Sequence, residues 1–181
     1  MDRLKLATVW LGGCSGCHMS FLDLDEFLID FAARVDVVYS PIADVKEYPE
    51  GVDVCLIEGA VCNEDNLELL HKIRARTKTL VSFGDCAITC NVTSLRNLLG
   101  GKNTDLILQR AYIEAADTNP VRPTLDGILP RLLPQVRPVH DVVAVEHFLP
   151  GCPPPAPRIK AFLSHLLDQA PALSGQQLKF G

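Results

Sequence analysis

The sequence has few of the features that mark a nucleic-acid-binding or membrane protein. It contains no run of lysine and arginine, and its formal net charge is −5. Such a chain lacks the phosphate contacts that dominate nucleic-acid binding. Aromatic residues make up only 6%, which also argues against a platform for base stacking. No apolar run approaches the roughly 20 residues that a membrane helix needs. We therefore expect neither nucleic acid nor a membrane as a partner.

A convincing export signal is also missing. Arg3 and Lys5 precede an apolar stretch that leads to Cys14, but the stretch is barely as long as the shortest signal peptides require. The chain has seven cysteines. An odd number without export argues against a framework of disulfides. We therefore predict a cytoplasmic protein whose clustered cysteines are metal ligands or redox thiols.

The order of the apolar segments predicts an α/β fold. The expected strands are Leu4–Leu11, Val35–Tyr39, Val52–Ile57, Thr79–Phe83 and Val142–Val145. The expected helices are His18–Arg34, Glu64–Arg76, Val92–Leu99, Leu125–Leu133 and Pro157–Gln169. Alternating strands and helices favour a parallel sheet covered by helices on both faces. The pattern therefore indicates a flavodoxin-like, doubly wound sheet in three α/β/α layers.

The length favours one domain over residues 1–181, because the chain is too short for two full domains. Prolines break up residues 101–138, which we interpret as an irregular excursion containing the helix expected near 125–133. Residues 170–181 are expected to form a loosely held tail.

Cysteines follow three of the expected strands. Cys14 and Cys17 follow the first strand, Cys86 follows the fourth, and Cys152 follows the last. Because parallel strands end at the same edge of a sheet, we expect these thiols to converge there. Glycines lie directly before or between them, and glycine lets the backbone approach a bulky ligand. Four thiolates in a glycine-lined corner match the needs of a [4Fe–4S] cluster.

Other thiol sites remain open on these residues alone. Cys14-x-x-Cys17 after a strand is also the arrangement of thioredoxin-like redox motifs, which would leave Cys86 and Cys152 without a role. A structural zinc ion could use the same four thiols, although such sites usually draw their ligands from two close pairs. Bound FMN, which the fold suggests, is disfavoured because cysteines occupy the turn after the first strand.

Five further residues carry thiol, imidazole or carboxyl groups whose roles need to be assigned. Cys55 falls inside a strand and should fill the core. Cys62 and Cys90 are expected to be bystanders, although either could replace a ligand. His18 opens a helix beside the thiols, where we expect the helix surface or a subunit contact. Glu58 ends a buried strand, an unusual place for a carboxylate. Its role is proton transfer, cluster tuning or ordinary hydrogen bonding.

Four motifs, in this order, resemble those of the small subunit of [NiFe] hydrogenases. They are Trp10–Cys17 (WLGGCSGC), Ile57–Gly59 (IEG), Gly84–Ala87 (GDCA) and Pro150–Pro154 (PGCPP). The resemblance covers residues 4–168 and implies that Cys14, Cys17, Cys86 and Cys152 hold a proximal [4Fe–4S] cluster. It also implies that Glu58 lies close to that cluster and that a partner large subunit binds the nickel–iron site.

The chain is most similar to the small subunits of soluble, bidirectional, NAD-reducing hydrogenases. Many family members have a twin-arginine signal and continue into a domain with further clusters, whereas this chain has no such signal and ends soon after Cys152. This type implies diaphorase partners that carry FMN and further iron–sulfur clusters and exchange electrons with NAD. The resemblance thus implies an electron relay in reversible H2 oxidation, with no catalysis by this chain alone. The cluster subunit of respiratory complex I is the alternative, and a weaker one, because it has adjacent cysteines in place of Cys14-x-x-Cys17.

Overall fold

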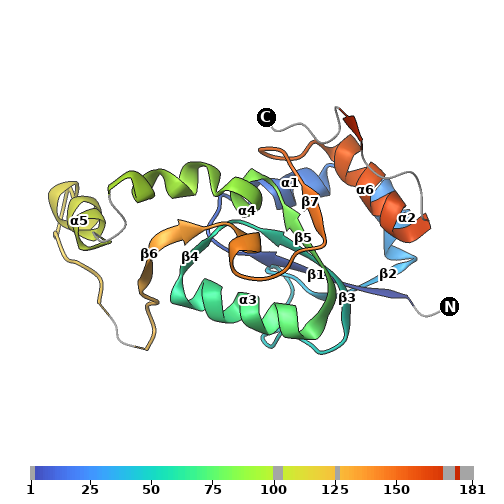
Figure 1. The fold of residues 1–181 in the computed structure, drawn as a ribbon, viewed down its shortest axis with the longest axis horizontal. Coiled ribbons are helices and arrows are strands. Elements are labelled where there is room, and N and C mark those ends of the chain that lie inside the picture. Colours follow the sequence, from blue (N-terminus) through green and yellow to red (C-terminus); the bar gives the residue numbers. More distant parts are fainter. Residues whose placement is uncertain (1–2, 100–103, 125–126, 169–173, 176–181) are drawn as a thin grey trace.

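The centre of the fold is a five-stranded parallel sheet (Figure 1). The computed structural model describes residues 3–99, 104–124, 127–168 and 174–175. The strands in spatial order are β2 (Val35–Tyr39), β1 (Leu4–Trp10), β3 (Val52–Glu58), β5 (Thr77–Phe83) and β7 (His147–Leu149). All four neighbouring pairs are parallel. Counted along the chain, this is the order 2-1-3-4-5 of flavodoxin-like folds. The predicted α/β fold class is confirmed.

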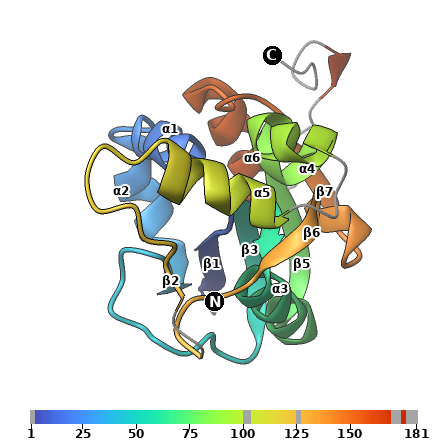
Figure 2. The same cartoon turned by 90° about the vertical axis from the view of Figure 1, so that its left-hand side faces the viewer.

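Helices cover both faces of this sheet. The α-helices are α1 (Gly16–Leu22), α2 (Phe27–Ala32), α3 (Glu64–Arg76), α4 (Asp85–Thr89), α5 (Thr104–Gln109) and α6 (Ala156–Asp168). Two 3-10 helices, η1 (Asn91–Leu99) and η3 (Val139–Asp141), and one π-helix, η2 (Arg110–Glu114), accompany them. Figure 2 shows α1, α2 and α6 on one side of the sheet and α3 on the other. This is the expected three-layer arrangement.

Strand β3 shows why the sheet has a core on each face. Leu56 packs with Phe31 and Phe162 under α2 and α6, whereas its neighbour Ile57 packs with Leu70 of α3. Successive side chains of a strand point to opposite faces, so a strand in the middle of a doubly covered sheet is apolar throughout. Cys55 belongs to the α3 core and has no exposed surface. Its predicted place in the core is confirmed.

The helix predicted over His18–Arg34 is two helices in the structure. Helix α1 ends at Leu22, and α2 begins at Phe27. Between them Asp25 has a φ of +48°. A residue in the left-handed region cannot continue a right-handed helix. The apolar spacing survives because both short helices turn the same face to the sheet. In contrast, α3 has the predicted bounds, and the Asn63 side chain caps it by accepting the Asn66 N–H at 2.8 Å.

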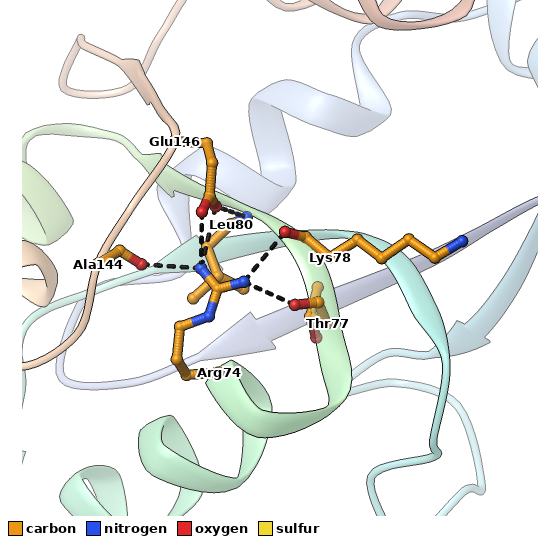
Figure 3. Close-up of polar contacts among 6 residues, drawn as sticks. All are labelled: Arg74, Thr77, Lys78, Leu80, Ala144 and Glu146. Atoms are coloured by element: carbon orange, nitrogen blue, oxygen red, sulfur yellow. Dashed lines mark hydrogen bonds and ion pairs between the residues drawn. The ribbon is translucent and has the colours of Figure 1, made fainter.

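The strand predicted over Val142–Val145 is wrong, and the real strand β7 begins at His147. The N–H groups of Val142 and Val143 both donate to the Val139 carbonyl, so the apolar run forms a turn. A polar network then fixes the start of β7 (Figure 3). The Glu146 carboxylate accepts the Leu80 N–H of β5 at 2.6 Å and two hydrogen bonds from the Arg74 guanidinium, each at 3.0 Å.

The excursion over 101–138 is more regular than predicted. Its described part contains α5, η2 and strand β6 (Leu132–Arg137). Strand β6 pairs antiparallel with β4 (Val61–Asn63). The helix predicted near 125–133 is wrong for residues 127–133, where Pro130 lacks an amide donor and β4 offers an open strand edge. Leu125 and Asp126 lie outside the described residues. In Figure 1, α5 lies at one end of the molecule.

The tail predicted over 170–181 lies outside the described residues, apart from 174 and 175. Within the described ranges, every helix is too short or too polar to span a bilayer.

Candidate functional site: four thiols at three strand ends

Four cysteines occupy the loops after three parallel strands of the sheet. Cys14 and Cys17 follow β1, Cys86 follows β5 and Cys152 follows β7. Cys17 is 7% exposed and Cys86 is 8% exposed, whereas Cys14 and Cys152 face the surface. The site therefore has a buried inner side and an open outer side. It lies near the switch point between β1 and β3, where ligands of such folds usually bind.

The electrostatics show that these thiols are neighbours. Burial, and after it the charges of Cys152 and Cys14, raise the pKa of Cys86 to about 11. Burial likewise raises the pKa of Cys17, and Glu58, Cys86, Cys14 and Cys152 add to the effect. Redox-active thiols have a lowered pKa instead. The inner thiols are therefore poor nucleophiles, and a positively charged metal group would favour their ionised form.

The donor set fits an iron–sulfur cluster. It consists of thiols alone, which are the soft ligands such clusters use. Gly84 leaves room for the Cys17 sulfur, because a Cβ on Gly84 would lie 2.2 Å from that Sγ. Among the described residues, no three His, Cys, Asp or Glu side chains lie close enough to share a single metal ion. Ligands of a [4Fe–4S] cluster bind different iron atoms and need not meet that condition.

Glu58 holds the first turn of α1 beside Cys17. Its carboxylate accepts the Cys17 N–H at 3.2 Å and the His18 N–H at 2.9 Å, and it is hydrogen-bonded to the His18 Nδ1. Ser15, at the N-cap of α1, makes no side-chain capping bond and has a φ of +67°. A carboxylate that accepts several donors at once can remain buried. Glu58 is only 2% exposed and takes over the missing cap.

His18 is not on the helix surface, where the sequence placed it. Its side chain is 12% exposed. The ring packs edge-on against Trp10, with 5.2 Å between centroids, and tilted against Phe83, at 6.1 Å. The Nε2 atom is buried and has no hydrogen-bond partner among the described residues. The physical reason is the Glu58 carboxylate, which draws the imidazole inward. A subunit contact at His18 stays a prediction.

Cys62 and Cys90 form a second group behind the first cysteine loop. Cys90 and Cys62 pack with Ala60 and Val136. The Cys62 sulfur lies against Gly12, where a Cβ would be 2.1 Å from it. Burial raises the pKa of Cys90 to about 11, with further contributions from Cys62, Asp141 and Cys86.

Two residues that sequence reasoning missed join the loops of the site. The Ser20 hydroxyl of α1 donates to the Pro154 carbonyl at 2.6 Å. The Asp85 carboxylate accepts the Gly151 N–H at 2.6 Å. Asp85 lies between a glycine and a cysteine in the Gly84–Ala87 motif, and that position is its sequence signal. No local signal points to Ser20, because its partner is 134 residues away.

The fold and this thiol edge match one protein family. The profile of the family described as "NADH ubiquinone oxidoreductase, 20 Kd subunit" matches residues 14–166, so the chain belongs to that family. A solved structure described as "Crystal structure of NAD+-reducing [NiFe]-hydrogenase in the H2-reduced state" contains a similar chain. The TM-score is 0.91 at 37% identity, over 99% of this chain and 100% of the other.

Curated relatives are hydrogenase subunits. The delta subunit of the NAD-reducing hydrogenase HoxS of Cupriavidus necator is 35% identical over 93% of this chain and 81% of its own length. A subunit of the F420-non-reducing hydrogenase vhu of Methanococcus voltae is 40% identical over 88% of this chain and 54% of its own length. The chain thus spans about half the length of the F420-non-reducing hydrogenase subunits that it matches. The resemblance to hydrogenase subunits is confirmed.

Proposed function

We propose that this chain is the cluster-holding small subunit of an NAD-reducing [NiFe] hydrogenase. Cys14, Cys17, Cys86 and Cys152 would hold one [4Fe–4S] cluster. The single observation that carries this proposal is that four thiols from three strand ends meet at one edge. The similarity to chains of NAD-reducing enzymes supports NAD as the electron acceptor of the complex.

The residues of this chain would supply position and environment. When bound, the cluster would accept and release single electrons between the nickel–iron site of a large subunit and the FMN and iron–sulfur groups of diaphorase subunits. The cysteines supply the ligands, and burial of Cys17 and Cys86 keeps water from the inner side. Glu58 anchors the Cys17 turn through its two backbone hydrogen bonds. Such contacts around a metal group tune its potential. A role of Glu58 in proton transfer is part of the same proposal.

An apolar ridge beside the site supports a partner surface. Val92, Leu95 and Leu98 are 61%, 62% and 83% exposed. They are three residues apart on η1, and a 3-10 helix has three residues per turn, so they form one line. We call these three residues the η1 ridge. The opposite side of η1 is fixed by Arg96, which donates to the Cys62 and Leu133 carbonyls at 2.9 and 2.8 Å.

The η1 ridge lies close to Cys86 in the sequence, because η1 directly follows α4, where Cys86 lies. A contiguous apolar patch that is exposed on a protein surface marks an interaction site. We propose that the large subunit covers the edge that carries the thiols, and that the assembly is cytoplasmic, in keeping with the unpaired thiols.

Iron and acid-labile sulfide per chain test the proposal. The chain, purified with the subunits that accompany it, should be brown and should bleach on reduction. Cys17→Ala should lose both the cluster and H2-dependent NAD reduction. Cys55→Ala is the matched control, because it removes a buried thiol outside the site and should keep both. A colourless, active protein that contains zinc would refute the proposal.

The electron acceptor is tested by a separate assay. Other relatives are gamma subunits of coenzyme F420 hydrogenases. H2-dependent reduction of NAD, NADP and F420 by the purified complex should favour NAD. Preference for F420 would leave the cluster assignment intact and overturn the NAD-linked part.

A further inference from the structure

Two hydrogen bonds join the loop of Cys86 to the loop of Cys152. The Asp85 Oδ1 accepts the Gly151 N–H at 2.6 Å, and the Asp85 N–H donates to the Gly151 carbonyl at 2.9 Å. We call this pair of bonds the Asp85–Gly151 clasp. Each of its residues directly precedes a thiol of the site. The clasp therefore ties together the backbone positions next to two cysteines that are far apart in the sequence.

The clasp extends the sheet beyond the point where its ladder ends. The last paired residues of β5 and β7 are Phe83 and Leu149, and the Gly84 N–H still donates to the Leu149 carbonyl at 2.8 Å. After Gly84 the chain turns into α4, so no backbone carbonyl of β5 can serve the next amide. The Asp85 side chain supplies the acceptor that a continuing strand would have offered.

The Gly151 amide depends on this acceptor. Gly151 is buried, has a φ of +139°, and would place a Cβ 2.5 Å from the Pro154 Cα. The backbone is thus bent tightly, out of contact with solvent. A buried amide without a partner is strongly unfavourable. Removing the Asp85 carboxylate would leave this one unpaired, and only the bond from the Asp85 N–H to the Gly151 carbonyl would remain of the clasp.

The carboxylate is itself buried, because Asp85 is 8% exposed. Burying a charge is costly unless hydrogen bonds offset it. An asparagine would offer the same acceptor oxygen without that charge. The negative charge also acts on the site, since Asp85 is among the groups that raise the pKa of Cys86 after burial, Cys152, Cys14 and Glu58. The effect of the hydrogen bond to Gly151 can therefore be separated from the effect of the negative charge by comparing Asp85→Ala with Asp85→Asn.

We propose that Asp85 is a positioning residue of the thiol site, whose buried carboxylate fixes the Cys152 loop relative to Cys86. The part of this proposal that concerns cluster binding rests on the proposed function. The clasp acts before any metal is present, because both of its partners belong to the folded chain. It presets two of the four ligands, and the Glu58 contacts preset a third, Cys17.

The test compares Asp85→Ala with Asp85→Asn in the chain purified with its accompanying subunits. Asp65→Asn, an exposed acid in the first turn of α3, controls for loss of one charge. Three quantities are measured: iron per chain, the electron paramagnetic resonance spectrum after reduction, and hydrogen exchange at the Gly151 amide. Asp85→Ala should lose at least half of its iron and exchange the Gly151 amide about tenfold faster, as loss of one charge-assisted bond implies.

Asp85→Asn decides between the bond and the charge. It should keep the iron content and the slow Gly151 exchange, while its spectrum and potential shift because the charge is gone. Wild-type iron content and exchange in Asp85→Ala would overturn the proposal. So would equal iron loss in both variants, which would make the charge the operative property. If Asp85→Ala fails to fold, the proposal is overturned by loss of iron or faster Gly151 exchange in Asp85→Asn, which keeps the acceptor oxygen. If the wild-type protein binds no iron, the proposed function fails, and Gly151 exchange still tests the clasp.

Discussion

The carboxylate of Glu58 binds both the backbone N–H of His18, at 2.9 Å, and the Nδ1 of its ring, although the two residues are 40 positions apart. Through this contact the end of β3 holds the start of α1. The same carboxylate reaches the Cys17 N–H. The first cysteine loop is therefore shaped by a residue from a different strand.

Replacing Glu58 should loosen the Cys17 turn. Glu58→Ala leaves the backbone N–H groups of Cys17 and His18 and the His18 Nδ1 without their partner, which should lower the free energy of unfolding by about 3 kcal/mol and reduce iron binding. Glu58→Gln keeps one acceptor oxygen and should fall between Glu58→Ala and the wild type. Melting temperature and iron per chain measure the two effects. Full iron content and unchanged melting of Glu58→Ala would show that these contacts have no role.

Gly84 should tolerate no side chain. Gly84→Ala would place its Cβ 2.2 Å from the Cys17 sulfur, in a residue with a φ of +86°. The matched control is Gly51→Ala, which has a φ of +69° and no atom within 4 Å of the added Cβ. Both variants carry about 1–2 kcal/mol of backbone strain. Only Gly84→Ala should also lose iron, so equal iron contents of the two variants would contradict the geometry of the site.

The Arg74–Glu146 network should make stability depend on pH. Partial burial raises the pKa of Glu146, but the Leu80 N–H and Arg74 outweigh it and hold the pKa below its ordinary value of 4.5. A carboxylate with a lowered folded-state pKa stabilises the protein above the unfolded pKa, and this stability is lost as the pH falls through the folded pKa. Glu146→Gln should therefore cost about 1 kcal/mol at pH 7, discounted for exposure.

The difference between Glu146→Gln and the wild type should shrink below pH 4.5, the ordinary value. This difference in stability is measured by thermal melting of both proteins at about pH 7 and about pH 3.5, on either side of that value. Asp44→Asn, at an exposed acid that pairs with Lys46, should show no comparable loss at pH 7. A constant difference across this range would indicate that the charge of Glu146 does not contribute.

The η1 ridge should be needed for assembly. Leu98→Asp adds a charge to a side chain that is 83% exposed, so the fold should survive while partner binding is weakened at least tenfold. Ile29→Asp is the control, because Ile29 is 73% exposed but lies on α2. Co-purification of the large subunit with each variant measures the effect. Equal recovery with both variants would remove the η1 ridge from the interface.

The sequence was a good guide wherever one local signal was enough. Asn63 marked the start of α3, and the cysteines at the strand ends marked the edge where they meet. It was a poor guide where a distant partner decides the local structure. The run Val142–Val145 has the composition of a strand, yet Glu146 is bound by Arg74 and Leu80, so β7 starts later. Leu132–Arg137 becomes a strand because β4 provides an edge for it.

By itself the sequence determined the parallel α/β architecture and the four thiols at its edge. The reason is that strand period, glycine turns and strand order follow from neighbouring residues and general topology rules. Only the tertiary structure decided how those thiols are held. Glu58 at the α1 turn, Ser20 at Pro154 and Asp85 at Gly151 each satisfy a group from another segment. Such pairings require two distant parts of the chain to be in place, and no local pattern records them.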